Sequence, residues 1–180
     1  MINVLVWLFV TILSLPAEAQ GILIDKESRI SFFSEAPLEN ISAETKKAAS
    51  ALDMDKYEIA FKVPIKSFVF KKRLMQEHFN ENYMESDKFP YATFSGKINE
   101  PLDWQRNGAY QVTVSGNLEI HGVKKLYTTT ATIEVSETMV GTTAKFRVRV
   151  VDHNIKIPRV VIKNIAEVVE VDVSATYRKQ

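Results

Sequence analysis

The sequence predicts an all-β fold, a sandwich or a barrel of roughly seven or eight strands with one short helix. Three observations predict it. Apolar residues alternate with polar ones along most of the chain, as they do in a strand with one buried face. The alternating stretches are short, follow one another closely and are separated by turn residues. Helical periodicity is clear over residues 73–83, and the other segments lack it.

The first strands precede this helix. Arg29 to Ser34 is expected to be a strand. Ser42 to Leu52 is rich in alanine and lysine, and intrinsic propensity favours a helix there although its apolar spacing is poor. Met54 to Ile65 alternates strongly, and Ser67 to Phe70 extends that strand or bends away from it. One face of this strand is expected to carry the apolar residues Tyr57, Ile59, Phe61, Val63 and Ile65.

The helix is predicted over Arg73 to Tyr83. Met75, Phe79 and Tyr83 recur every four residues, which gives the segment one apolar face, and Leu74 and His78 lie beside it. Pro90 and the polar residues before it end the helical pattern.

The remaining strands show strict alternation. They are expected at residues 92–98, 110–120, 127–135, 144–150 and 169–177, and His121-Gly122 forms a turn between the second and the third. The segment 110–120 alternates without a fault. An outer-membrane barrel is an alternative, but these strands lack paired aromatic girdles and the chain ends in Arg178-Lys179-Gln180.

Residues 1–19 differ in composition from the rest and are predicted to be a signal peptide. Val4 to Leu15 is almost wholly apolar, Pro16 breaks the run, and Ala17-Glu18-Ala19 has the A-x-A form of a cleavage site. Residues 20–180 would then form one domain that is periplasmic or secreted. A buried N-terminal strand or an uncleaved anchor is the alternative.

The composition excludes several classes of function. The chain has no cysteine, which rules out disulfides, thiolate metal sites and cysteine nucleophiles. The formal net charge is +1 and rises to +2 when Glu18 is removed with the leader, so the sequence predicts no nucleic-acid partner. No apolar run is long enough for a stable membrane span in the mature chain. The oligomeric state is left open, with a homodimer as one option.

No motif for catalysis or for a cofactor is present. His78, His121 and His153 lack the i, i+4 spacing of a helical metal pair, and there is no Gly-x-Ser-x-Gly elbow or glycine-rich phosphate loop. The sequence therefore predicts no catalytic residue, no metal and no cofactor. An enzyme that uses His121 or His153 is the alternative. Lys145, Arg147 and Arg149 form a basic stripe that is interpreted as a solvated strand face.

Aromatic and flexible apolar residues gather around the helix. Core packing is the simplest interpretation, but an eight-stranded barrel can also hold one small ligand, and alternation alone does not decide between a filled and a hollow interior. The residues of this group are Phe61, Phe68, Phe70, Leu74, Met75, Phe79, Tyr83, Phe89, Tyr91 and Phe94.

Several segments together resemble the YceI-like family of lipocalin-like, polyisoprenoid-binding proteins, in the expected order and over nearly all of residues 20–180. They are FKVPIKSFVF at 61–70, Leu74-Met75, His78-Phe79, Tyr83 to Ser86, FPYATFSG at 89–96, GNLEIHGVKK at 116–125 and Asp152 to Pro158. The resemblance implies an antiparallel lipocalin-like β-barrel of about eight strands with one short helix near the barrel mouth. It also implies that Ser42 to Leu52 is strand and hairpin, against its helix propensity.

The resemblance implies a ligand site inside the barrel. The motif positions expected to line it are Phe61, Phe68, Phe70, Leu74, Met75, Phe79 and Phe94. The expected function is that of an exported carrier for a long apolar molecule such as an isoprenoid, a quinone-like lipid or a fatty amide. The alternative is a structural or protein-interaction barrel with a filled core.

Overall fold

The structure, a computed structural model, describes residues 21–35, 40–156 and 167–179. The signal peptide predicted at residues 1–19 lies outside the described residues.

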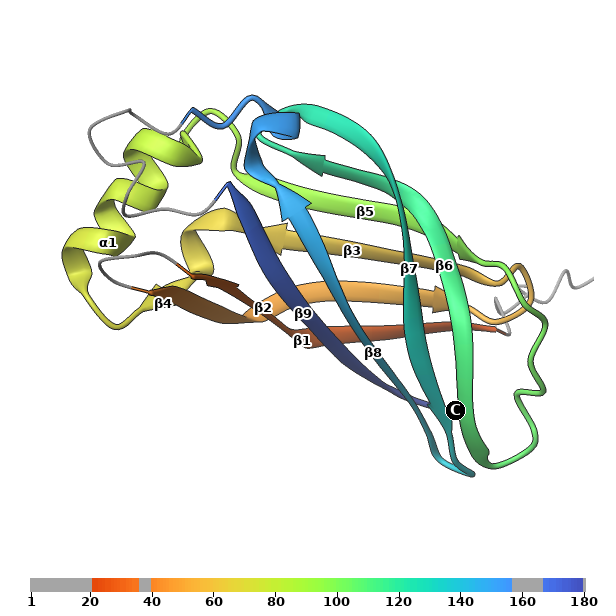
Figure 1. Ribbon diagram of the computed structural model, residues 1–180. Coiled ribbons are helices and arrows are strands. Elements are labelled where there is room, and N and C mark those ends of the chain that lie inside the picture. Colours follow the sequence, from red (N-terminus) through yellow and green to blue (C-terminus); the bar gives the residue numbers. More distant parts are fainter. Residues whose placement is uncertain (1–20, 36–39, 157–166, 180) are drawn as a thin grey trace, which may run out of the picture.

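Eight long strands form a closed antiparallel barrel (Figure 1). Around it the strands follow the order β1-β9-β8-β7-β6-β5-β3-β2, and β2 pairs with β1 to close the ring, which confirms the predicted barrel. A ninth, two-residue strand, β4, pairs with β2 beyond the end of β3. The strands are β1 (Ile22–Ser34), β2 (Ile41–Asp53), β3 (Glu58–Pro64), β4 (Val69–Phe70), β5 (Tyr91–Ile98), β6 (Gly108–Ile120), β7 (Val123–Val135), β8 (Met139–Arg149) and β9 (Val168–Arg178).

The predicted helix is present at one end of the barrel. The α-helix α1 (Arg73–His78) continues directly into the π-helical turn η2 (Phe79–Tyr83). Two 3₁₀ turns, η1 (Ile65–Ser67) and η3 (Val150–His153), follow β3 and β8. Figure 1 shows α1 beside the end of the barrel that β4 and η3 also occupy.

The helix favoured by propensity at Ser42 to Leu52 is wrong, because this segment is part of strand β2. Ala43, Ala48 and Leu52 are buried inside the barrel, and the backbone pairs with β1 on one side and with β3 on the other. Two long ladders and small inward side chains outweigh the weak intrinsic preference of alanine and lysine for helix.

The strand expected from Met54 is shorter than predicted and begins at Glu58 as β3. Residues 54–57 form a turn in which the Asp53 carboxylate accepts hydrogen bonds from the backbone N–H groups of Asp55 and Lys56. Tyr57 lies in the left-handed region with a φ of 56°. The turn interrupts the alternation that the sequence shows on both sides of it.

The barrel interior is filled at the end away from α1. Leu52, Ile133, Val140 and Tyr177 are fully buried there in one core cluster. Two smaller clusters lie toward the α1 end, one around Phe68 and the other around Ile65, Met84 and Ile155. The interior is therefore neither wholly packed nor wholly hollow.

Candidate functional site

An apolar cavity of about 220 Å³ lies in the barrel toward the α1 end. Among the residues that the structure describes, no side chain lining it carries a charge. Every long strand contributes to its wall except β2, and η1, η2 and η3 close its end. The lining includes Ile30, Phe32, Val63, Ala92, Val114, Leu118, Ile120, Phe146, Val148, Val171 and Val173.

Four of the seven predicted lining residues, Phe61, Phe68, Phe79 and Phe94, line this cavity. Phe70 is buried behind them and contacts Phe79, with ring centroids 5.0 Å apart.

The two predicted residues on α1 lie outside the cavity wall. Met75 packs against the aromatic cluster, while Leu74 is 61% exposed. Adjacent residues on a helix point about 100° apart, so the face that turns Met75 and Phe79 inward turns Leu74 outward. The expectation that Leu74 lines the cavity is wrong in this structure. Whether any of the seven binds a ligand stays a prediction.

A cluster of four phenylalanine rings closes the α1 end of the cavity. Phe32 stacks on Phe79 at 5.5 Å and contacts Phe68 and Phe70 at 5.4 and 5.8 Å. Sequence reasoning missed Phe32. The alternation of buried Ser28 and Ile30 points to it, because residues two apart share a face.

Two glycines make room for Phe94. Gly96 on β5 and Gly116 on β6 face each other in register. A Cβ atom at Gly116 would lie 2.5 Å from the carbonyl oxygen of Ser95 and 2.7 Å from Cζ of Phe94. The ring therefore covers a stretch of bare backbone, and this contact positions it in the cavity wall.

A buried histidine anchors one edge of the cavity. His153 is 0% exposed, and its Nδ1 donates to the carbonyl oxygen of Val123 at 3.0 Å. In the neutral ring Nε2 must then accept, and it lies 3.0 Å from the hydroxyl of Tyr127, whose side chain lines the cavity. Burial, with a further contribution from Asp152, raises the pKa of Tyr127, and Arg149 partly opposes the rise.

The other two histidines do not enter the cavity. His121, in the β6–β7 turn, approaches the backbone carbonyl of His153 through Nδ1 at 3.2 Å and the Glu85 carboxylate through Nε2 at 2.6 Å. This confirms the turn predicted at His121-Gly122. His78 is exposed on α1. Within the described ranges, no group of three or more histidine, aspartate or glutamate side chains is placed to hold a metal ion.

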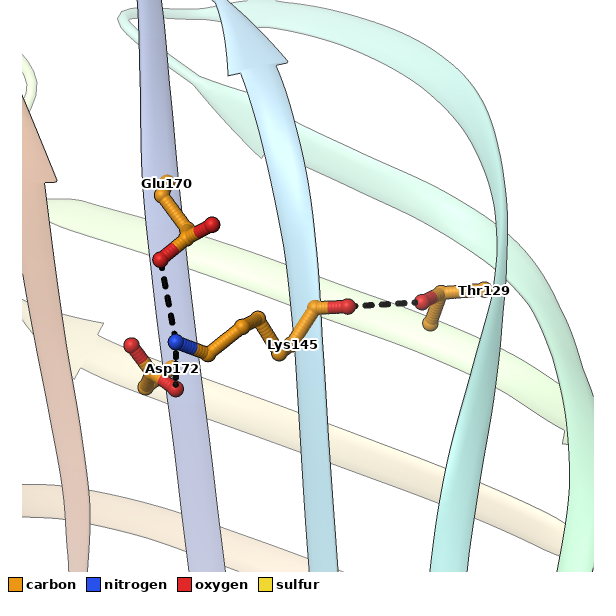
Figure 2. Close-up of polar contacts among 4 residues, drawn as sticks. All are labelled: Thr129, Lys145, Glu170 and Asp172. Carbon is orange, nitrogen blue, oxygen red and sulfur yellow. Dashed lines mark hydrogen bonds and ion pairs between the residues drawn. The ribbon is translucent and has the colours of Figure 1, made fainter.

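The basic stripe on β8 is a solvated face, as interpreted from the sequence. Lys145, Arg147 and Arg149 are exposed. Figure 2 shows Lys145 Nζ between two carboxylates of the neighbouring strand β9, Glu170 at 2.9 Å and Asp172 at 3.2 Å. Both contacts raise the pKa of Lys145, and the hydrogen bond to Glu170 has the larger effect.

Comparison with known proteins identifies the domain type. The family model of the YceI-like domain matches residues 23–177. No curated protein sequence matches the chain. In the part of the chain that the structure describes, no helix is both long and apolar enough to span a bilayer.

Three solved structures share the fold. A polyisoprenoid binding domain from Saccharophagus degradans, implicated in plant cell wall breakdown, superposes with a TM-score of 0.73 at 14% identity, over 88% of this chain and 98% of that one. BcnA from Burkholderia cenocepacia superposes with a TM-score of 0.70 at 15% sequence identity, over 83% of this chain and 95% of that one. The YCEI protein of Campylobacter jejuni superposes with a TM-score of 0.63 at 14% sequence identity, over 81% of this chain and 89% of that one.

Proposed function

The chain belongs to the YceI-like domain family, and on this premise we propose that it is an exported carrier that encloses part of a long apolar molecule in its barrel. The observation that carries the proposal is the cavity, about 220 Å³ of space without a charged side chain in its described wall. A packed barrel has no need of such a space, since protein interiors are close-packed and voids cost stability. The described polyisoprenoid binding of the Saccharophagus domain supports an isoprenoid or similar chain as the ligand class.

The cavity volume limits how much of the ligand is enclosed. An engineered cavity of about 150 Å³ in another protein takes one benzene molecule. A cavity of about 220 Å³ thus encloses a segment of a long chain and not the whole chain. The rest of the ligand extends out of the barrel, or the aromatic cluster moves to admit it.

The apolar wall sets what the cavity selects. Burying one methylene group contributes about 0.8 kcal/mol before the costs of association are subtracted. With no charged group in the described wall to orient a headgroup, affinity depends on chain length and shape. The sequence expectation that the protein is not an enzyme is part of this proposal.

Export is the second part of the proposal and rests on the sequence of residues 1–19. The expected location is periplasmic or secreted. Expression of the full chain, cell fractionation and N-terminal sequencing would test it. The mature chain should begin at Gln20, whereas a retained residue 1 in the cytoplasmic fraction would contradict export. Light scattering on the same material would decide between a monomer and a homodimer.

A structural barrel with a filled core is the second candidate, because the core around Leu52 and Tyr177 fills one end of the interior. On that candidate, Phe94→Ala would carry the usual core cost of roughly 3–5 kcal/mol and change no binding. On the carrier proposal, substitutions in the cavity wall weaken binding.

Mass spectrometry of an organic extract of the purified protein tests the carrier proposal. The expected result is a co-purified apolar molecule at a reproducible ratio to protein. Val171→Trp, which places an indole in the cavity wall, should lower that ratio. Leu126→Trp is the matched control, since Leu126 is 74% exposed. An empty extract, or equal loading of both variants, would count against the proposal.

A further inference from the structure

Strands β7 and β8 part from each other halfway along the barrel. Their ladder runs from Val135, opposite Val140, to Ala131, opposite Ala144, and stops there. Yet β7 extends back to Val123 and β8 extends on to Arg149. Figure 1 shows β7 and β8 running apart from each other over part of their length.

The ladders on either side of the gap do not stop. β7 pairs with β6 along its whole length, to Val123 opposite Ile120, and β8 pairs with β9 to Arg149 opposite Val168. The gap is therefore a local feature of the β7–β8 boundary and not the frayed end of the sheet.

Side chains cross the gap where backbone hydrogen bonds would otherwise lie. Thr129 Oγ1 donates to the carbonyl oxygen of Lys145 at 3.3 Å (Figure 2). The rings of Tyr127 and Phe146 meet edge to face, with centroids 6.1 Å apart. Tyr127, Thr129 and Phe146 all line the cavity, and all three keep intermediate exposure although they face the interior.

Both ends of the gap are held. The ladder at Ala131 and Ala144 closes one end. His153 closes the other, where its Nδ1 donates to the Val123 carbonyl of β7. The seven residues 124–130 of β7 lie between these ends, which at roughly 3.3 Å per residue gives a slot about 25 Å long.

We propose that this slot is a side entrance through which the apolar chain reaches the cavity, with Tyr127 and Phe146 as its gate. The inference rests on the proposed carrier function. Passage there requires the two half-exposed rings to change rotamer and to give up the hydrogen bond between Tyr127 and His153, but it breaks no ladder hydrogen bond. Passage at the α1 end must instead displace Phe79 from its contacts with Phe32, Phe68 and Phe70.

Cross-linking the slot tests the proposal, and the absence of native cysteine makes the chemistry selective. Thr128→Cys with Arg147→Cys, joined by a short bismaleimide, would tie the two strands together. Both side chains are exposed and outside the cavity lining, and they would face each other if the ladder register continued. The matched control is Gln111→Cys with Thr132→Cys, which face each other across the fully paired β6–β7 ladder.

The readout is stopped-flow fluorescence of cis-parinaric acid, a fatty acid whose conjugated apolar chain brightens when it leaves water. Cross-linking the slot should slow both association and dissociation by about tenfold or more while the Kd stays within about twofold, because a blocked path changes rates and not the bound state. The un-cross-linked double variant and the cross-linked control should match the parent protein in both rates. Circular dichroism checks that each variant is folded.

A second variant moves the rates in the opposite direction. Phe146→Ala removes one ring of the gate and should speed both association and dissociation. Unchanged rates in the cross-linked protein, or slower rates in Phe146→Ala, would overturn the side entrance and leave the carrier function standing. If cis-parinaric acid fails to bind the parent protein, the proposed function falls and this inference falls with it.

Discussion

Nε2 of His153 lies 3.0 Å from the hydroxyl of Tyr127, so a fully buried imidazole holds a phenol that lines the cavity. When Nδ1 of the neutral ring donates to the Val123 carbonyl, Nε2 accepts a hydrogen bond from the Tyr127 hydroxyl. One histidine thus joins η3 to β7 at the end of the gap between β7 and β8.

Tyr127→Phe should destabilise the protein by about 1–3 kcal/mol, because it leaves Nε2 of a buried histidine without a partner. Urea unfolding at neutral pH measures the loss. Tyr110→Phe is the control, since the Tyr110 hydroxyl donates to the Arg106 carbonyl in an exposed setting. Its removal should lower the free energy of unfolding by less. Equal losses in the two variants would contradict the importance of the buried bond.

Gly116→Ala should destabilise by about 1–3 kcal/mol or more, because the new methyl group would collide with the Ser95 carbonyl and the Phe94 ring. It should also weaken ligand binding by shifting Phe94. Gly141→Ala is the matched control on β8, where the nearest atom to an added Cβ is 3.7 Å away. Thermal unfolding of both variants decides the point, and similar melting temperatures would contradict it.

Leu52→Ala and Phe79→Ala should separate stability from binding. Leu52 is 0% exposed in the filled half of the barrel, and its truncation should cost about 2–5 kcal/mol and leave ligand affinity intact. Phe79 borders the cavity, so its truncation enlarges the site and should lower affinity. Denaturant titrations and fluorescence titrations with cis-parinaric acid give the two quantities. Loss of affinity in Leu52→Ala alone would reverse the assignment.

Alkaline pH should unfold the protein through Tyr177. Burial raises the pKa of Tyr177 from 10.0 to about 12, with a partial opposing effect from the nearby Ser50 and Thr142 hydroxyls. The folded state therefore holds a proton that the unfolded state releases first. The stabilisation is complete below pH 10, and up to roughly 3 kcal/mol is lost as the pH rises toward 12.

Tyr177→Phe keeps the ring and removes the titrating hydroxyl, so this part of the alkaline loss should disappear. Free energies of unfolding at several pH values between 9 and about 12 would show it. A loss of the same size in the variant would assign the alkaline transition to other groups.

The strands were predictable because alternation is a local property. Each of the segments at 110–120 and 169–177 carries its own buried face, whatever its partner. Ser42 to Leu52 was misjudged by propensity for the opposite reason. It forms a strand because it pairs with β1 and β3, and these partner residues lie outside the segment whose propensity was considered.

The candidate site was predictable in part. Phe61, Phe68, Phe79 and Phe94 stand in motif segments and line the cavity. Leu74 stands in the same segments and is exposed, because a helix turns neighbouring residues to different sides. Alternation along its strand places Phe32 on the inward face, but its contact with Phe79 and the pairing of Tyr127 with His153 gave no signal, since these partners lie far apart in the sequence.

By itself, the sequence determined an all-β fold of alternating strands with one short helix, no cysteine chemistry, and an aromatic-rich stretch next to the helix, and its resemblance to a known family narrowed that fold to a barrel. Only the tertiary structure decided that the barrel is filled at one end and hollow at the other, and that β7 and β8 part beside the hollow half. The physical reason is that side-chain direction follows from the period of each strand. The filling of a barrel and the point where two strands separate depend instead on how non-local ladders twist and on which side chains meet inside.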